Sequence, residues 1–249
     1  MKYLYYEKSE KLAVVTLARG KVNAIDREVI DEFSELFSRL SREPDIRSAI
    51  ITGQGKFFSF GFDVPLLYDY SPQDFTQFLR AFCRMYREIF LFPKPLVAAI
   101  NGHAVAGGCI LALMADYRIM TESNGKMALN EVTFGAALFA GAVEMLRYAV
   151  GNKNAAELLL SGKMFTPQEA QNLGLVDYLV PEPELAAAAQ RKAEEMGRYY
   201  GPNYAALKGL LRYPIVEEWS RREEDSIQKF VEIWYSPETR AKTREIKIF

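Results

Sequence analysis

Residues 100–109 read Ile100-Asn101-Gly102-His103-Ala104-Val105-Ala106-Gly107-Gly108-Cys109. Apolar residues continue on both sides, from Leu96 to Ala115, and a run of this length raises the question of a membrane span. The turn-forming pair Asn101-Gly102 interrupts the run, however, and Pro95 precedes it. The pattern therefore predicts a buried strand, a tight loop and a buried helix that begins at Gly107.

Two other segments have a similar layout. Residues 53–64 combine the end of a predicted strand with a glycine turn, and Asp63 is the expected N-cap of a helix that follows. Residues 127–135 place a single carboxylate, Glu131, after a short apolar strand. Each of the three segments thus places a loop with candidate functional groups at the end of a buried strand.

The first part of the chain repeats a strand–strand–helix pattern, and the last quarter is helical. Strands are predicted at Tyr3–Glu7, Leu12–Leu17, Ser48–Thr52, Leu96–Ile100 and Asp116–Thr121, and helices at Arg27–Leu40 (capped by Asp26), from Ser71 to about Phe92, and from Thr166 to Gly174. After Glu182 we expect helices divided at Gly201-Pro202, Pro214 and Ser236-Pro237. This organisation predicts a core at residues 1–190 and a C-terminal helical region at residues 191–249.

Composition excludes several classes of protein. The chain has 249 residues and a formal charge of −1, which argues against a nucleic-acid-binding protein, because such a protein needs a basic face. Its two cysteines cannot form a disulfide framework, and its single histidine, His103, excludes a zinc site built from several histidines. We therefore expect no metal, and acid–base chemistry that depends on a carboxylate, Lys or Tyr. The N-terminus lacks the apolar region of a signal peptide, so a cytoplasmic location is expected.

The order and spacing of the three segments resemble those of the crotonase superfamily, also called the enoyl-CoA hydratase/isomerase family. The stretch Gly174-Leu175-Val176-Asp177-Tyr178-Leu179-Val180-Pro181 extends the resemblance, which covers essentially the whole chain. The resemblance implies an α/β fold: a crotonase-like spiral of ββα units with two roughly perpendicular sheets, followed by C-terminal helices. It also implies a homotrimer or a dimer of trimers that uses those helices. Because the apolar run from Leu96 to Ala115 is interrupted, no membrane partner is expected.

By resemblance, the backbone amides of Phe62 and Gly107 form an oxyanion hole and Glu131 is the catalytic acid–base. A helix that begins at Gly107 directs unpaired N–H groups outward, which gives the first assignment a physical basis. Apolar neighbours of Glu131 would raise its pKa and make it a better proton acceptor. The resemblance further implies that an acyl group enters as a coenzyme A thioester, with no permanently bound cofactor.

The resemblance places the CoA contacts at Lys21, Val22 and Ala24, and along Phe60, Gly61, Phe62, Asp63 and Val64. Several roles stay open. Lys21 either reaches a CoA phosphate or is an ordinary solvated lysine, and Asn130 either places the substrate or only forms a turn. Asp63 is favoured as a helix cap, and His103 as a packing residue beside the loop. The apolar residues Phe75, Phe78, Phe82 and Met85 either line a pocket or pack in the core.

Two apolar positions favour isomerisation over hydration. Family hydratases carry a first glutamate three residues beyond the oxyanion glycine, where this chain has Ile110. Family dienoyl isomerases carry an acid eight residues beyond the catalytic Glu, where this chain has Phe139. The single carboxylate, and Asn130 before it, resemble mitochondrial-type Δ3,Δ2-enoyl-CoA isomerases. The expected reaction converts a 3-enoyl-CoA to a trans-2-enoyl-CoA. The alternatives are an enoyl-CoA hydratase or another crotonase-type lyase or hydrolase, and a non-catalytic acyl-CoA-binding protein.

Overall fold

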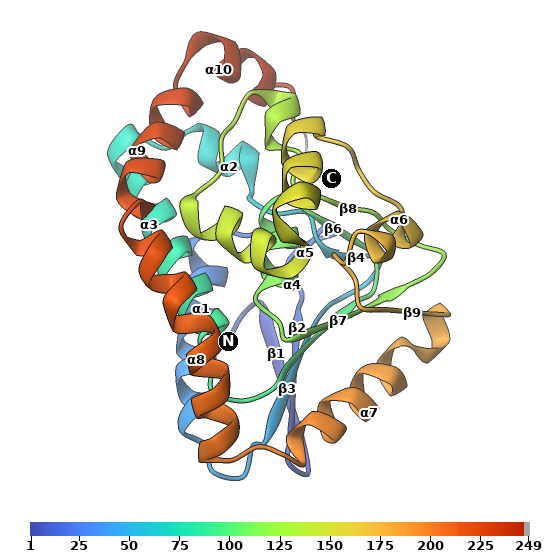
Figure 1. Ribbon diagram of the computed structural model, residues 1–249. Helices are drawn as coiled ribbons and strands as arrows, with labels where there is room; N and C mark the ends of the chain where they lie inside the picture. Colours follow the sequence, from blue (N-terminus) through green and yellow to red (C-terminus); the bar gives the residue numbers. More distant parts are fainter. Residues whose placement is uncertain (247–249) are drawn as a thin grey trace.

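Two β-sheets organise the computed structural model, which describes residues 1–246 (Figure 1). The larger sheet has six strands in the order β1 (Leu4–Ser9), β2 (Leu12–Leu17), β3 (Ser48–Gly53), β5 (Leu96–Ile100), β7 (Tyr117–Thr121) and β9 (Tyr178–Val180). The smaller sheet has three strands in the order β4 (Phe57–Ser59), β6 (His103–Val105) and β8 (Met127–Ala128). Strands β1 and β2 are antiparallel, and every other pairing in the two sheets is parallel. The expected α/β spiral is confirmed.

The chain alternates between the two sheets. Strands β3, β5 and β7 of the larger sheet are each followed by one strand of the smaller sheet, namely β4, β6 and β8. Because β4, β6 and β8 are parallel, their carboxyl ends lie along the same edge. The segments that follow these strands, which begin at residues 60, 106 and 129, are therefore neighbours in space although they are far apart in the sequence.

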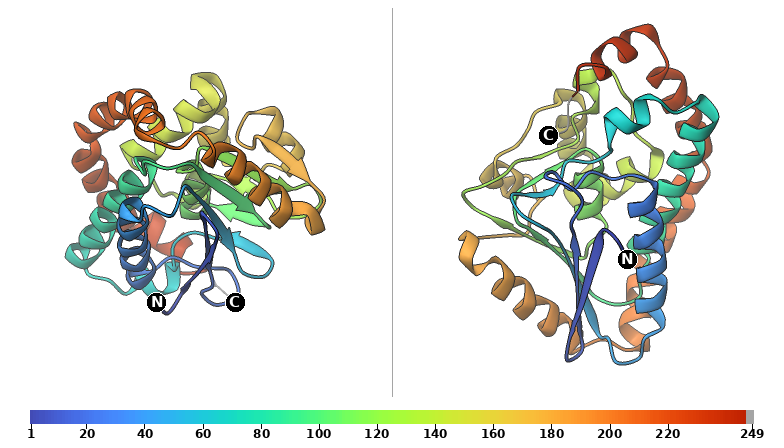
Figure 2. Two further views of the ribbon diagram at one scale, coloured as in Figure 1. Left: turned by 90° about the horizontal axis from the view of Figure 1, so that it is seen from below. Right: turned by 180° about the vertical axis from the view of Figure 1, so that it is seen from behind.

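Helices cover both faces of the larger sheet. Helix α7 (Leu185–Gly197) packs on one face through Leu185, Ala188, Ala189 and Ala193, which cluster with Ile50 and Val97 of the sheet. The other face is covered by the main core, which includes α1 (Arg27–Arg42), α3 (Pro72–Phe90), α4 (Gly107–Leu113) and α5 (Ala140–Ser161) (Figure 2). Shorter helices α2 (Val64–Tyr68), α6 (Pro167–Asn172) and the 3₁₀ turn η2 (Glu182–Glu184) connect these elements. The apolar segment from Leu96 to Ala115 becomes β5, β6 and α4, and no helix within residues 1–246 is long and apolar enough to span a membrane.

The expected helix caps are confirmed. The Asp26 carboxylate accepts a hydrogen bond from the Val29 backbone N over 2.9 Å at the start of α1. Thr166 and Glu169 form the capping box that the sequence predicts for α6. These contacts depend on residues three positions apart, so local sequence is enough to predict them.

The expected break at Pro214 is wrong, because α8 (Pro202–Ser220) runs through it without interruption. Pro214 lies on the exposed side of this helix, where water can solvate the carbonyl that loses its N–H partner. Arg212 before it, and Val216 and Trp219 after it, are buried in the protein. Packing on both sides of the proline therefore outweighs the free-energy cost of the helical hydrogen bond that is lost there.

Buried ion pairs anchor α8 to the core. Lys208 Nζ lies 2.7 Å from Oδ2 of Asp116, and Arg212 Nη2 lies 2.8 Å from Oδ1 of the same carboxylate. Arg212 also donates to the backbone carbonyls of Phe90, Met114 and Ala115. Helices α9 (Glu223–Trp234) and α10 (Pro237–Thr243) follow, and the buried residues Phe230 and Trp234 of α9 join the main core. The proposed division at residue 190 falls inside α7 and stays a prediction.

Candidate active site

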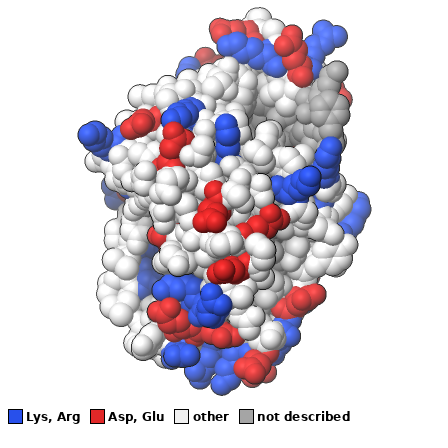
Figure 3. Space-filling view, turned by 90° about the vertical axis from the view of Figure 1, so that its right-hand side faces the viewer, with Lys and Arg blue, Asp and Glu red and all other residues white. Residues whose placement is uncertain are grey.

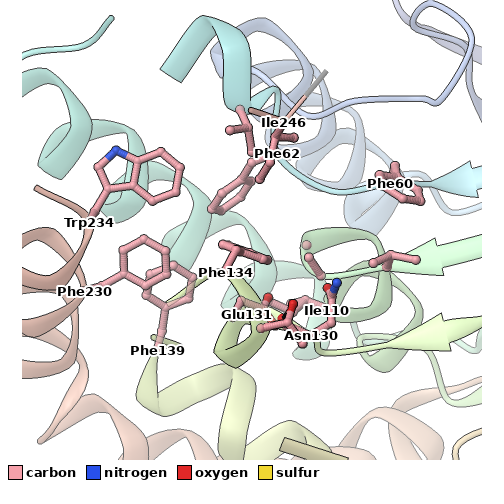
Figure 4. Close-up of a pocket in the computed structure, with 15 residues that line it drawn as sticks. Phe60, Phe62, Ile110, Asn130, Glu131, Phe134, Phe139, Phe230, Trp234 and Ile246 are labelled. Atoms are coloured by element: carbon pink, nitrogen blue, oxygen red, sulfur yellow. Dashed lines mark hydrogen bonds between the residues drawn. The ribbon is translucent and has the colours of Figure 1, made fainter. Parts of the chain in front are cut away.

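An apolar cavity of about 320 Å³ lies at the edge of the smaller sheet. It is lined by Phe60, Phe62, Val64, Val105, Ala106, Gly107, Ile110, Asn130, Glu131, Thr133, Phe134, Phe139, Phe230, Trp234 and Ile246. Figure 4 shows Phe139, Phe230 and Trp234 together on one side, and Glu131, Asn130 and Ile110 together away from them. All three segments singled out in the sequence contribute to this lining.

Glu131 is the first residue of η1 (Glu131–Phe134), a 3₁₀ turn that Leu129 and Asn130 separate from β8. Thr133 Oγ1 donates to the Asn130 carbonyl over 2.7 Å, and Gly135 ends the turn in a left-handed conformation with φ 77°. The Glu131 residue is only 6% exposed. Within residues 1–246, its Oε2 atom and the Oδ1 atom of Asn130 are buried without a hydrogen-bond partner. Two polar atoms in this apolar cavity are thus available to a ligand.

Burial raises the pKa of the Glu131 carboxyl to about 8, because a charged carboxylate is poorly solvated in this cavity. A hydrogen bond from its own backbone N–H acts in the opposite direction and lowers the pKa. Among the described residues that line the cavity, Glu131 is the only acidic one. A carboxylate with this raised pKa is a stronger base than an ordinary solvated carboxylate. Glu131 is therefore better suited to remove a proton near neutral pH.

The amides of Phe62 and Gly107 lie on two touching loops. The Ile25 N–H donates to the Gly61 carbonyl over 2.8 Å, and the Asp63 N–H donates to the Ile25 carbonyl over 3.0 Å. These two bonds flank Phe62, whose own N–H has no acceptor on the described part of the chain. Gly107 is the first residue of α4, so its N–H has no partner in a preceding helical turn.

Gly61 allows the two loops to approach each other. Its φ is +85°, and a Cβ atom there would lie 2.8 Å from the backbone N of Gly107 and 2.9 Å from the carbonyl oxygen of Val105. Ala106, which precedes α4, also adopts a positive φ of 49°. A non-glycine residue in such a conformation is strained, and strain of this kind is concentrated at functional sites.

Ile110 and Phe139 are each 1% exposed and both line the cavity. Ile110 comes from the first turn of α4, and Phe139 precedes α5. These two side chains therefore present only hydrocarbon to the space around Glu131, at the positions where the sequence resemblance pointed to the absence of a second acid. Water held there would find few hydrogen-bond partners.

The residues expected to contact CoA divide into two groups. Phe60, Phe62 and Val64 line the cavity, and Gly61 lies between them. The segment Lys21, Val22 and Ala24 does not line it, but the Phe60 N–H donates to the Val22 carbonyl over 3.0 Å, so this segment lies alongside. The Lys21 side chain is exposed, whereas Val22 and Ala24 are buried.

Three other residues have clear structural contacts. The Asp63 carboxylate caps α2 by accepting from the Leu66 N–H over 3.2 Å, as expected. The His103 ring stacks on Phe57, with ring centroids 5.2 Å apart, and does not line the cavity. The core contains Phe75, Phe78, Phe82 and Met85. The rings of Phe78 and Phe82 also contact the Phe62 ring, with centroids 5.0 and 4.8 Å from its centroid.

Sequence reasoning did not assign Phe230, Trp234 or Ile246 to the site. Phe230 and Trp234 lie one helical turn apart on α9, and this spacing indicates only a buried face. Arg19, which pairs with Asp63 beside the cavity, was also missed. No local pattern marks these residues, because their contacts join parts of the chain that are far apart.

Comparison with known proteins agrees with this architecture. The family model for Enoyl-CoA hydratase/isomerase matches residues 7–242. The chain is 31% identical over 238 residues to carnitinyl-CoA dehydratase of Escherichia coli O157:H7, covering 94% of this chain and 90% of that protein. It is 28% identical over 221 residues to mitochondrial enoyl-CoA delta isomerase 1 of Rattus norvegicus, covering 88% of this chain and 76% of that protein.

The crystal structure of human mitochondrial delta3-delta2-enoyl-CoA isomerase has the same fold, with a TM-score of 0.92 at 24% identity over 97% of this chain and 95% of that one. The two-sheet spiral with its C-terminal helices defines a protein of the crotonase class. The chain belongs to the enoyl-CoA hydratase/isomerase family and is an enzyme of that family. Its relatives include isomerases, hydratases and dehydratases, so family membership alone does not select one reaction.

Proposed function

We propose that this enzyme isomerises 3-enoyl-CoA thioesters to trans-2-enoyl-CoA thioesters, with Glu131 as its single acid–base. The observation that carries the proposal is that Glu131 is the only acidic side chain among the described residues of a mostly apolar cavity. A double-bond shift requires one group that removes a proton and returns it. Hydration requires a second group to hold and activate water.

The reaction proceeds in two proton transfers. The Glu131 carboxylate removes a proton from C2 of the 3-enoyl thioester, and the electron pair moves onto the thioester oxygen. The Phe62 and Gly107 amides donate hydrogen bonds to this enolate oxygen, and one such donor typically contributes about 3 kcal/mol to transition-state stability. The enolate electrons then return as Glu131 delivers the proton to C4, which leaves the double bond between C2 and C3.

The apolar cavity supports this proposal in a second way. Ile110 and Phe139 surround Glu131 with hydrocarbon, so the enolate meets little competing water. The raised pKa of Glu131 keeps its proton affinity close to that needed for both transfers. Beside Glu131, the Oδ1 atom of Asn130 is buried and has no hydrogen-bond partner among the described residues, and we propose that Asn130 helps to place the substrate.

The CoA part of the substrate lies, in this proposal, along Lys21, Val22, Ala24 and the segment 60–64. This path borders the mouth of the cavity, where Phe60 is 38% exposed. The enzyme needs no permanently bound cofactor, because the thioester is already activated for enolate formation. Figure 3 shows acidic and basic side chains interspersed on one face, in line with a net charge of −1, and a few local cations are enough for the CoA phosphates.

We also propose that the protein forms a homotrimer or a dimer of trimers. Helix α8 exposes large apolar side chains, with Leu207, Leu210 and Leu211 at 62%, 74% and 60% exposure. A monomer in solution would leave this apolar face in contact with water. Analytical ultracentrifugation tests the proposal, and a purely monomeric protein would contradict it. A cytoplasmic location stays a prediction.

The direct test of function is incubation with 3-hexenoyl-CoA, followed at the ultraviolet absorbance of the conjugated 2-enoyl product. We expect turnover by the wild type and its near-complete loss in Glu131→Gln. Full activity of the Gln variant would disprove the role of Glu131.

Hydration is the second candidate, because the relatives include a carnitinyl-CoA dehydratase. Fast hydration of crotonyl-CoA without isomerisation would favour it. Binding of thioesters without turnover of either compound would indicate a non-catalytic acyl-CoA-binding protein.

A further inference from the structure

Arg19 lies in the loop between β2 and α1, and its guanidinium group joins residues 24–26 to Asp63. Its Nη2 atom lies 2.8 Å from Oδ2 of Asp26 and 2.8 Å from Oδ2 of Asp63. Its Nη1 atom donates to the Ala24 carbonyl over 3.3 Å. The Arg19 side chain is 17% exposed, so these contacts are largely shielded from water and are stronger than those of a surface ion pair.

Both carboxylates that contact Arg19 are also helix caps. Oδ1 of Asp26 accepts from the Val29 N–H over 2.9 Å and caps α1. Oδ1 of Asp63 accepts from the Leu66 N–H over 3.2 Å and caps α2. Each carboxylate therefore uses one oxygen for its own helix and the other for Arg19. The guanidinium group holds the starts of two helices together.

Phe62 lies directly before one of these caps. The Ile25–Gly61 and Asp63–Ile25 backbone bonds hold the peptide groups around Phe62 against the segment that Arg19 also contacts. The loop 61–63 is thus tied to residues 24–26 by backbone bonds and, through Asp63, by Arg19. Rotation of the Phe62 N–H would require these contacts to shift together.

We propose that Arg19 is a positioning residue that directs the Phe62 N–H toward the thioester oxygen. The proposal rests on the proposed function, since it takes Phe62 as a donor to that oxygen. Arg19 is not among the described residues that line the cavity, so we assign it no direct contact with substrate. It acts through Asp63. Loss of Arg19 is expected to weaken the hydrogen bond from the Phe62 N–H to the thioester oxygen more than it weakens the binding of CoA.

A binding comparison isolates this effect from turnover. Hexanoyl-CoA has the thioester carbonyl but no double bond to move, and the thioether S-hexyl-CoA lacks the carbonyl. We expect the wild type to bind the thioester more tightly. Arg19→Met should reduce this preference while the affinity for the thioether stays within about twofold, because only one donor is misplaced. An equal loss for both ligands, or an unchanged preference, would overturn the proposal.

The matched control is Arg27→Met. It removes an ion pair with Asp31, at 2.9 Å, on the exposed surface of α1, the helix that Asp26 caps. This variant should keep the wild-type preference for the thioester. A loss of preference in the control equal to that in Arg19→Met would assign the effect to general damage of α1 and would overturn the role of Arg19.

Kinetics provide the second measurement. Arg19→Met should lower kcat about 10- to 100-fold with little change in KM, as expected for a displaced reacting geometry. Arg19→Lys should recover part of this loss, because an ammonium group can contact both carboxylates but lacks the second planar donor for Ala24.

Asp63→Asn should reproduce much of the loss in kcat. The combined losses in the double variant Arg19→Met/Asp63→Asn should be less than additive, because both changes break the same contact. Fully additive losses in the double variant would overturn the proposed route through Asp63. If Arg19→Met does not fold, Arg19→Lys replaces it in the cycle with Asp63→Asn, and additive losses there would overturn the route in the same way.

The two hypotheses can fail separately. A wild type that prefers the thioester but isomerises no substrate would remove the proposed function, and the role of Arg19 could still be decided by binding. A wild type that binds thioester and thioether equally would overturn the positioning role even if turnover is measured.

Discussion

Phe139 stacks on Phe230, with ring centroids 4.9 Å apart and ring planes inclined by 19°. The contact joins the residue before α5 to the middle of α9, and both rings line the cavity. A C-terminal helix therefore closes one wall of the site. The size of the acyl chain that fits is expected to depend on this wall.

Phe230→Ala should move the preferred substrate toward longer acyl chains, because the removed ring leaves space inside the cavity. It should also lower the free energy of unfolding by about 3–5 kcal/mol, as is usual for a buried phenylalanine. Phe75→Ala is the matched control, since Phe75 contacts Phe230 and Trp234 but does not line the cavity. Rates with thioesters of increasing chain length, and urea unfolding, measure both effects. An equal change in chain-length preference in the control would contradict the prediction.

The pH dependence of kcat/KM should reveal Glu131. The base must be ionised in the free enzyme, and burial raises its pKa to about 8. We therefore expect kcat/KM to rise with pH, level off above about 8, and fall about tenfold per unit below that value. Rates with 3-hexenoyl-CoA between about pH 5.5 and 9.5 are the measurement. A profile that stays flat down to about pH 6 would show that an ordinary carboxylate, or no carboxylate, is the base.

The free energy of unfolding should also depend on the ionisation of the Glu131 carboxyl. It should decrease as pH rises, whereas kcat/KM should increase. The folded state keeps its proton up to a pKa of about 8, whereas the unfolded chain releases it near the ordinary glutamate value of 4.5. The contribution of this carboxyl to the free energy of unfolding is thus fully present below pH 4.5, and it is lost as the pH rises from 4.5 to about 8. Glu131→Gln should melt at a higher temperature than the wild type at pH 9, and the difference should shrink toward pH 5. A constant difference at all pH values would contradict the assignment.

Gly61→Ala should lower kcat/KM by about 100-fold or more, comparable to the removal of an oxyanion donor. The added Cβ atom would lie 2.8 Å from the backbone N of Gly107, so the two loops must separate. Gly55→Ala is the control, because its φ of +74° imposes similar backbone strain but no heavy atom lies within 4 Å of the added Cβ. Steady-state kinetics and thermal melting of both variants separate the effect of crowding from that of strain. Equal kinetic losses would mean that strain alone is responsible.

Local sequence rules predicted what depends on neighbours in the chain. Caps at Asp26 and Thr166 follow from side chains that reach backbone groups three residues away. Strand ends followed by glycine turns indicated the loops at Phe62 and Gly107, and resemblance to a family indicated which groups on them matter.

The rest of the structure depends on contacts across the chain. Pro214 breaks a helix by local rules, but α8 continues because Arg212 and Trp219 are buried on either side of it. Phe230 and Trp234 show the spacing of a buried face, yet only the tertiary structure reveals that this face borders the cavity that contains Glu131. Arg19 is an unremarkable loop arginine until Asp26 and Asp63 are seen to meet it.

The spiral arrangement has a consequence for how this enzyme could acquire a different reaction. Each winding of the chain delivers one functional loop to the shared edge, and each loop is held by its own strand and helix. A substitution at residue 110 or 139 can therefore change the chemistry around Glu131 while the windings that carry the other groups stay in place. In the proposed reaction, such a scaffold separates the amides that hold the thioester oxygen from the residues that decide what becomes of the enolate, so new reactions can arise by single steps.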